Sequence, residues 1–230
     1  MTKTTKHIID ILIVADVSLL AFLIEGYAIT QEWVTIGEEA RGASAVIIAA
    51  LVAVGLVFAR GGSFADLGFK RPKRWSKLFI QVFIILIIFL AAQTLVPLLV
   101  SLFLTLPPPD WSRYDSINGN LSAAIVLALL LPLVAALPEE IIYRGFLMGR
   151  LSDIFARSFA GSSMTVLISA FAFAAVHFTW GIGGVVFGFI MGVIWGTAYI
   201  LCGRNLWVVI FAHSGGHILF VIYLYLGLAK

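Results

Sequence analysis

The chain has 230 residues and a formal net charge of +3, and 61% of its residues are hydrophobic while only 12% are charged. Soluble domains average roughly 45–50% apolar and about 25% charged residues, so this composition excludes an ordinary soluble domain. The mean hydropathy of +1.07 agrees with that exclusion. No basic stripe interleaved with aromatic residues accompanies the positive charge, so we expect no nucleic-acid partner.

The apolar residues gather in runs of about 18 or more, the helical length that crosses ~30 Å of hydrocarbon. These runs lack the period-two alternation of barrel strands, so helices are the remaining way to span a bilayer. The sequence therefore predicts an all-α, polytopic transmembrane bundle of about seven or eight helices in one domain, 1–230. The expected spans are residues 7–29, 43–59, 78–106, 121–150, 162–180, 182–202 and 206–228.

Lysine and arginine concentrate at the N-terminus and in every second connection, and this distribution sets the orientation. The cations on this side include Lys3, Lys6, Arg60, Lys70, Arg71, Lys73, Arg74, Lys77, Arg150 and Arg157. The alternate connections hold only Arg41 and Arg113. We predict a multi-pass protein of the cell membrane, surrounded by the lipid bilayer, with a cytoplasmic N-terminus.

The first chemical signal is the segment PEEIIYR at positions 138–144. Glu140 and Arg144 are four residues apart and share a helical face, whereas Glu139 points toward the side of Tyr143. The arginine can neutralise one carboxylate and leave the other free to take a proton from water. A purely structural alternative is a helix that starts at Pro138, with acids near its positive end and an interfacial ion pair.

The second signal is the position of three histidines, His177, His213 and His217, inside apolar spans. Ionisable groups within a membrane are costly and usually face a polar interior or a water-filled cavity. A single such histidine is commonly an interhelical hydrogen bond, but three beside two glutamates favour a site that activates water. His213 and His217 also have the i, i+4 spacing with which two imidazoles hold one metal ion.

A glycine repeat lies between these histidines, in the sixth span. Small residues at every fourth position leave one helix face without side chains, so a neighbouring helix can approach closely. We expect the fifth or the seventh span to pack there. The repeat consists of Gly184, Gly188, Gly192 and Gly196.

These motifs resemble the CAAX protease and bacteriocin-processing family of intramembrane proteases (CPBP or Abi), which is related to type II CAAX prenyl endopeptidases. The family shares EExxxR, then FxxxH, then a late histidine followed four residues on by a polar residue, usually Asn. This chain has Glu139-Glu140-x3-Arg144, Phe173-x3-His177 and His213-x3-His217 in the same order. The segments 67–71 and 145–147 are also similar, and the resemblance covers residues 67–220, preceded by N-terminal helices in 1–66.

The resemblance implies an intramembrane endopeptidase that hydrolyses a peptide bond of a membrane-associated protein or peptide. Glu139 would activate the attacking water, His177 would share proton transfer, and His213 and His217 would stabilise the oxyanion. Glu140 and Arg144 would support the site by holding the glutamate helix in position.

His217 departs from the family pattern, because the family usually has Asn there. A neutral imidazole can still donate a hydrogen bond to an oxyanion. The extra histidine also allows a metal shell of Glu139, His177, His213 and His217, so the pattern requires no cofactor but leaves Zn²⁺ open. A glutamate that binds the metal does not also serve freely as the base.

Two other functions remain open from the sequence. One is a proton-coupled transporter that uses Glu139 and the histidines as a relay, although no internal repeat supports it. The other is a catalytically silent family member that binds a membrane partner.

The proposed site requires a particular geometry in the fourth span, which contains Pro132 and Pro138. If that span ended at Pro138, its glutamates would lie near the surface, too far from the histidines to share a proton. We therefore expect the helix to continue past Pro138 to about Arg150, and the site to open toward the cytoplasm. A span followed by a separate amphipathic helix is the alternative.

Two acids of the first span, Asp10 and Asp16, do not share a clean helical face. We expect them to be structural, with Asp10 paired to His7 near the interface.

Overall fold

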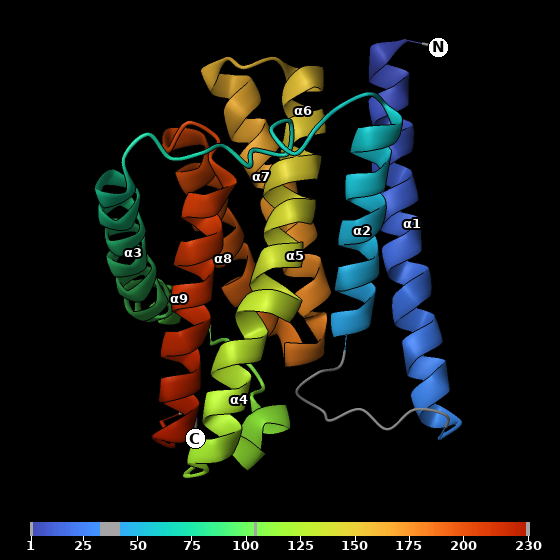
Figure 1. Ribbon diagram of the computed structural model, residues 1–230. Helices are drawn as coiled ribbons and strands as arrows, with labels where there is room; N and C mark the ends of the chain where they lie inside the picture. Colours follow the sequence, from blue (N-terminus) through green and yellow to red (C-terminus); the bar gives the residue numbers. More distant parts are fainter. Residues whose placement is uncertain (1, 33–41, 104, 229–230) are drawn as a thin grey trace.

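The computed structural model describes residues 2–32, 42–103 and 105–228. All regular elements in these ranges are helical, which confirms the predicted class (Figure 1). The first three helices are α1 (Lys3–Thr30), α2 (Ala43–Ala59) and α3 (Trp75–Ser101). The last three are α7 (Phe159–Ala175), α8 (Gly181–Leu201) and α9 (Leu206–Tyr225).

The fourth rod is one long stretch, Leu121–Phe155, of 35 residues. It consists of α4 (Leu121–Leu131), α5 (Leu137–Glu140) and α6 (Met148–Phe155), joined by π-helical turns at Pro132–Ala136 and Ile141–Leu147. A proline lacks the N–H that an α-helix needs, and a wider turn accommodates the missing bond without ending the helix. Continuation past Pro138 is therefore confirmed, and the alternative with a separate amphipathic helix is wrong.

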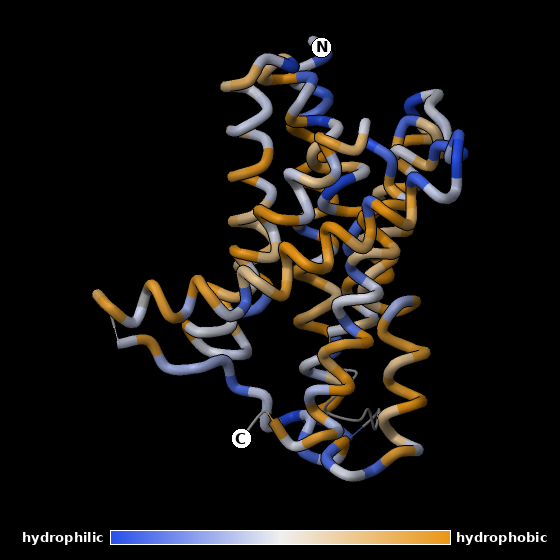
Figure 2. The backbone as a smooth tube through the Cα atoms, turned by 90° about the vertical axis from the view of Figure 1, so that its left-hand side faces the viewer, coloured by the Kyte–Doolittle hydropathy of each residue, from blue (hydrophilic) through white to orange (hydrophobic). Residues whose placement is uncertain are grey.

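The lengths of the helices and the side chains on their surfaces both indicate a membrane protein. Within the described residues, five helical stretches are long and apolar enough to cross a bilayer, and α2 is a shorter apolar helix. Large apolar side chains remain exposed along α1 and α3, among them Leu19 and Phe83, and at Phe103 just after α3. Figure 2 shows apolar residues along the rods and hydrophilic ones mainly toward the two ends, as expected for helices in lipid.

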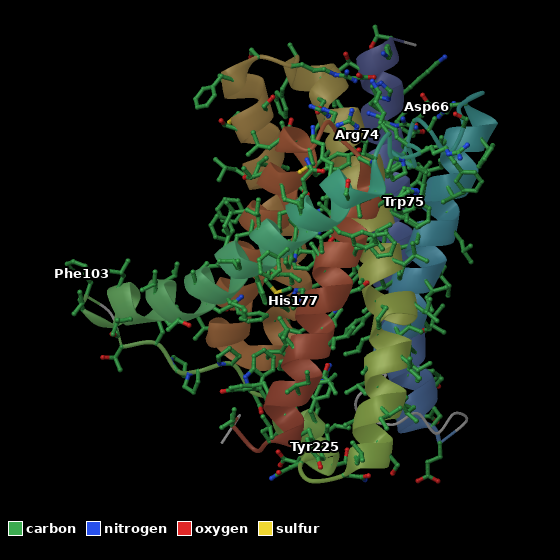
Figure 3. The ribbon with its side chains drawn as sticks, turned by 60° about the vertical axis from the view of Figure 1, so that its left-hand side comes forward. Asp66, Arg74, Trp75, Phe103, His177 and Tyr225 are labelled. Atoms are coloured by element: carbon green, nitrogen blue, oxygen red, sulfur yellow. The ribbon has the colours of Figure 1, made fainter. Side chains whose placement is uncertain are left out.

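The observed boundaries differ from the expected spans mainly at two places. The helix α3 ends at Ser101, short of residue 106, and its last part leaves the bundle, with Phe103 at the tip (Figure 3). The expected span 162–180 is α-helical only to Ala175 and continues as a 3₁₀ turn, η5 (Val176–Trp180). Arg41, part of the orientation argument, lies outside the described residues.

The helices pack as an α7–α8 hairpin beside the long rod and α9, with α3 against α8 and α9. The α1–α2 pair forms a separate wall: α2 contacts the long rod, and α1 contacts it through α6 (Figure 1).

Polar contacts near the N-terminus fix this wall, and they correct one expectation. Asp10 is 1% exposed and pairs with Arg60 at 2.8 Å and with Arg150 at 3.3 Å, not with His7. His7 instead contacts Asp153 at 3.2 Å. The expected Asp10–His7 pair is wrong because two guanidinium groups from α6 and the end of α2 reach Asp10. Asp16 is exposed.

Candidate active site

The two glutamates lie on α5, near the midpoint of the 35-residue rod. This position is far from both ends of the helix, so a surface location for the acids is excluded. A π-helical turn directly follows them, and such turns are frequent at functional sites because they re-aim the side chains around them.

Glu140 is the centre of a buried charged triad. Its carboxylate oxygen Oε1 accepts a hydrogen bond from Arg144 Nη1 at 3.0 Å and lies 2.8 Å from His213 Nδ1. Both Glu140 and Arg144 are 0% exposed. Because the carboxylate paired with arginine can only accept, Nδ1 of His213 carries the proton and donates it.

Arg144 has further partners on neighbouring helices. Its Nη2 donates to the carbonyl oxygen of Gly192 at 3.4 Å, and its guanidinium carbon lies 4.7 Å from the centre of the Phe173 ring. The arginine therefore connects the long rod to both α7 and α8, as expected for a residue that supports the site.

Glu139 turns away from that triad, as the sequence pattern indicates. Its side chain is 13% exposed and lines a cavity, and its Oε2 lies 3.7 Å from Nε2 of His213. This distance is too long for a direct hydrogen bond. The two glutamates thus approach opposite nitrogens of one imidazole ring.

His177 lies in η5, at the end of α7. Its Nδ1 donates to the carbonyl oxygen of Phe173 at 2.7 Å, so Nε2 of the neutral ring is left as an acceptor. The ring contacts Phe173 and Trp180, with centroid distances of 4.7 and 4.6 Å. His177 lies inside the bundle (Figure 3) and lines the same cavity as Glu139.

His213 and His217 are stacked one turn apart on α9, with ring centroids 4.5 Å apart and planes 23° from parallel. Trp195 also stacks on His213, at 5.6 Å and 25°, and Phe89 stacks on Trp195 at 5.2 Å. The orientation of the His213 ring is therefore set by its hydrogen bond to Glu140 and by the two rings that stack on it.

A metal-binding group is also present among the described residues. Glu139, His213 and His217 each offer one ligand atom, and these atoms lie within 4.8 Å of one another. His177, the fourth expected ligand, is not in this group.

The cavity beside the cluster has a volume of about 900 Å³. All four expected catalytic residues line it, and α1 and α2 form much of its opposite wall. Its lining reaches Thr30, Gly42, Arg113 and Thr179, at the end of the bundle away from the N-terminus. We expected the cavity to open toward the cytoplasm, and the side of the membrane to which it opens stays a prediction.

The glycine repeat packs against α7, the first of the two partners that the sequence allowed. A Cβ added at Gly192 would lie 2.7 Å from the backbone of Ala170, and one at Gly188 would lie 3.1 Å from the His177 ring. The glycines therefore let the two helices approach closely enough to bring His177 and the Gly192 carbonyl to the site.

Sequence reasoning missed Trp195, which is fully buried and stacks on His213. It lies one residue before Gly196, so the sequence signal was available as a large aromatic beside a glycine face. Recognising the role of Trp195 requires knowing that α8 lies against α9.

Comparison with known proteins gives one match. Residues 121–219 match the family model described as "Type II CAAX prenyl endopeptidase Rce1-like". This segment belongs to the CAAX protease family. It contains all six residues that the motifs singled out, from Glu139 to His217.

The match to the CAAX protease family supports CAAX-type intramembrane proteolysis as the general activity of the chain. Together with its apolar helices, it makes the chain a multi-pass membrane protein. No curated protein and no solved structure matches the chain. The helices α1–α3, including the wall of the cavity, lie outside the matched segment.

Proposed function

We propose that this protein is an intramembrane endopeptidase that uses water activated by Glu139 to hydrolyse a peptide bond of a membrane-associated protein or peptide. The observation that carries the proposal is the placement of Glu139 and Glu140 at opposite nitrogens of His213, beside a cavity of about 900 Å³.

The protonation pattern favours a water at this position. His213 donates through Nδ1 to Glu140, so Nε2 of the neutral ring is an acceptor, as is an ionised Glu139. Two acceptors 3.7 Å apart need a shared donor. A water molecule has two O–H groups and can donate to both, and hydrolysis requires that same molecule.

Catalysis then follows from general-base chemistry. Glu139 takes a proton from the water, and the hydroxide oxygen bonds to the carbonyl carbon of the scissile peptide. The carbonyl oxygen becomes an oxyanion, for which an imidazole N–H of His217 is the nearby donor. When the C–N bond breaks, the leaving amine receives the proton from Glu139, and Nε2 of His177 is a second acceptor on the cavity wall.

Glu140 and Arg144 have a positioning role in this scheme. Arg144 keeps Glu140 ionised, and Glu140 keeps the Nδ1 proton of His213, so that Nε2 faces Glu139. The cavity wall is mainly apolar, which suits a substrate that reaches the site from the membrane.

Membrane proteomes of cells that produce the wild type, Glu139→Gln or Asp16→Asn test the proposal. Asp16 is an exposed carboxylate of α1, so its variant is a matched control. We expect new peptide termini with the wild type and with Asp16→Asn, and a decrease of ~10²-fold or more with Glu139→Gln. The same new termini in cells with Glu139→Gln would contradict glutamate catalysis. If the wild type produced no new termini and Glu139→Gln kept the biological function of the wild type, a catalytically silent family member would be favoured.

A metal-dependent hydrolase is the second candidate, favoured by the convergence of Glu139, His213 and His217. Two imidazoles and a carboxylate fit catalytic Zn²⁺, which keeps a fourth position for water. Glu140 on Nδ1 of His213 also fits, since a carboxylate commonly orients a metal-binding histidine. Bound Zn²⁺ would supply the acidification of water, Glu139 would serve as a ligand, and His177 would remain as the base.

Metal analysis of detergent-purified protein distinguishes the two candidates. The metal-dependent form predicts about one divalent ion per chain in the wild type and a large loss in His213→Ala and His217→Ala. Equal, negligible metal in all three proteins would reject this form and leave the glutamate mechanism.

A further inference from the structure

The connection between α2 and α3, residues 60–74, carries positive charge that the fold does not neutralise. Arg60 is paired with Asp10, and Lys70 Nζ donates to the carbonyl oxygen of Gly203 at 2.9 Å. No ion pair within the described residues involves the remaining cations of this region, Arg71, Lys73, Arg74 and Lys77. All four are exposed.

One of these cations borders an aromatic hollow. The hollow has a volume of about 560 Å³ and is lined by Phe64, Phe69, Arg71, Pro72, Trp75 and Trp207. We call it the Arg71 hollow. Lys73, Arg74 and Lys77 do not line it, which separates Arg71 from the other cations.

The walls of the Arg71 hollow belong to a chain of ring contacts across three elements. Phe64 contacts Phe69 at 5.8 Å between ring centroids, and Phe69 contacts Trp207 at 5.2 Å. The chain continues through Phe211 and Phe79 to Trp75. Ring contacts thus connect the aromatic residues of the hollow, and the two ends of this series, Phe64 and Trp75, are 53% and 52% exposed.

The backbone around the hollow is held in place. Leu206 N donates to the Gly68 carbonyl at 2.8 Å, which ties the connection to the start of α9. Ser63 N donates to Asp66 at 2.7 Å and closes the turn before Phe64. A preformed shape at the rim lowers the ordering cost of binding a ligand.

The Arg71 hollow lies at one end of the apolar helices. Trp75 begins α3 and Arg74 directly precedes it, at the end of the bundle that also carries the N-terminus (Figure 3). Tryptophan rings at such a boundary lie at the level of lipid headgroups, and nearby cations attract anionic lipids.

We propose that the Arg71 hollow binds one anionic phospholipid, with its phosphate on the Arg71 guanidinium and the start of an acyl chain against the exposed faces of Phe64 and Trp75. The planar guanidinium forms two parallel hydrogen bonds to a phosphate, whereas non-directional attraction to surface cations provides no such geometry. The aromatic wall requires an apolar part in the ligand, which inorganic phosphate and an acidic peptide side chain both lack.

The test counts lipids that stay bound to the detergent-purified protein in native mass spectrometry after incubation with phosphatidylglycerol or phosphatidylcholine. We expect one retained phosphatidylglycerol and no specifically retained phosphatidylcholine. Arg71→Gln should weaken retention about tenfold or more, as for the loss of a charged, bidentate partner. Lys73→Gln removes the same charge from the same connection but outside the hollow. This variant should weaken retention of the lipid by about fivefold at most.

Three outcomes would overturn the proposal. Equal losses of retained phosphatidylglycerol in Arg71→Gln and Lys73→Gln would show that the lipid is held by general surface charge and not by the Arg71 hollow. Displacement by inorganic phosphate at the same concentration as the lipid would show a simple anion site, and displacement by an acidic peptide would show a protein-binding one. Arg71 is exposed and makes no ion pair with described residues, so equal melting temperatures of the variants are expected and exclude misfolding as the cause.

Discussion

At the scale of single residues, the site is organised around the His213 ring. Glu140 fixes one edge through Nδ1, Glu139 faces the other edge, and the rings of Trp195 and His217 stack on it. These contacts hold the ring in one orientation, which the proposed placement of a water between Nε2 and Glu139 requires.

Trp195 should therefore act as a positioning residue. We expect Trp195→Leu to lower kcat by up to ~10²-fold with little change in KM, because the His213 ring loses its stacking partner and a displacement of ~1 Å can cost that much. Trp195→Phe keeps a flat ring and removes an indole N–H that has no partner within the described residues, so most of the activity should return. Equal losses of kcat in the two variants would argue against stacking.

The two adjacent glutamates should differ sharply in their effect on stability. Glu140→Gln leaves Arg144 as a fully buried charge without its counter-ion, at a cost on the order of 3–5 kcal/mol in the free energy of unfolding. Glu139→Gln removes a cavity-lining carboxylate without an arginine partner, and its melting temperature in detergent should stay near that of the wild type. Similar melting temperatures for the two variants would contradict this division of roles.

At the scale of elements, the close approach of α7 and α8 delivers two groups to the site. The Gly192 carbonyl reaches Arg144, and His177 lies at the turn of the same hairpin. The glycine face predicted from the sequence is thus part of the architecture of the site.

Gly192→Ala should separate these helices. The added Cβ would lie 2.7 Å from Ala170 backbone, which cannot yield as a flexible side chain would, so we expect lower thermal stability and reduced activity. Gly55→Ala in α2 is a matched control, since a Cβ there has nothing within 4 Å and should gain up to ~1 kcal/mol of helix propensity. A Gly192→Ala variant as stable as Gly55→Ala would show that α7 and α8 have room between them for the added Cβ.

The sequence predicted these elements well where the signal was local. The bounds 43–59 for the second span agree with α2, and the long rod continued through Pro138 as the site required. The ends of α3 and α7 were less predictable, since apolar residues continue beyond the α-helix in both. Hydrophobicity reports contact with lipid or core, and it does not distinguish an α-helix from an apolar turn.

At the scale of the whole molecule, the α1–α2 wall determines which side of the bundle the cavity reaches. Asp10 clamps this wall to α6 near the N-terminus, and the cavity extends away from that clamp toward Thr30 and Thr179. With a cytoplasmic N-terminus, this end of the cavity would face the opposite side of the membrane.

Cysteine labelling tests this orientation. In a Cys202→Ser background, Ala65→Cys marks the end with the N-terminus and Ser112→Cys marks the cavity end, and both positions are exposed. A membrane-impermeant maleimide added to intact cells should label Ser112→Cys alone, because the connection that holds Ala65 carries the cationic excess. Labelling of Ala65→Cys alone would reverse the orientation and place the cavity opening on the cytoplasmic side.

The sequence by itself determined the membrane class and the residues of the candidate site. Long apolar runs can only be helices in lipid, and charged groups inside them are costly enough to mark a site. The pair Glu140–Arg144 also followed from helical spacing alone.

Only the tertiary structure decided which distant groups meet. It placed His213 between two glutamates more than 70 positions away, set Trp195 on its face, gave Asp10 two arginines instead of His7, and extended the cavity along α1 as far as Thr30. The physical reason is that periodicity fixes which face of a helix a residue occupies, whereas the helix that covers that face is chosen by the packing of the whole bundle.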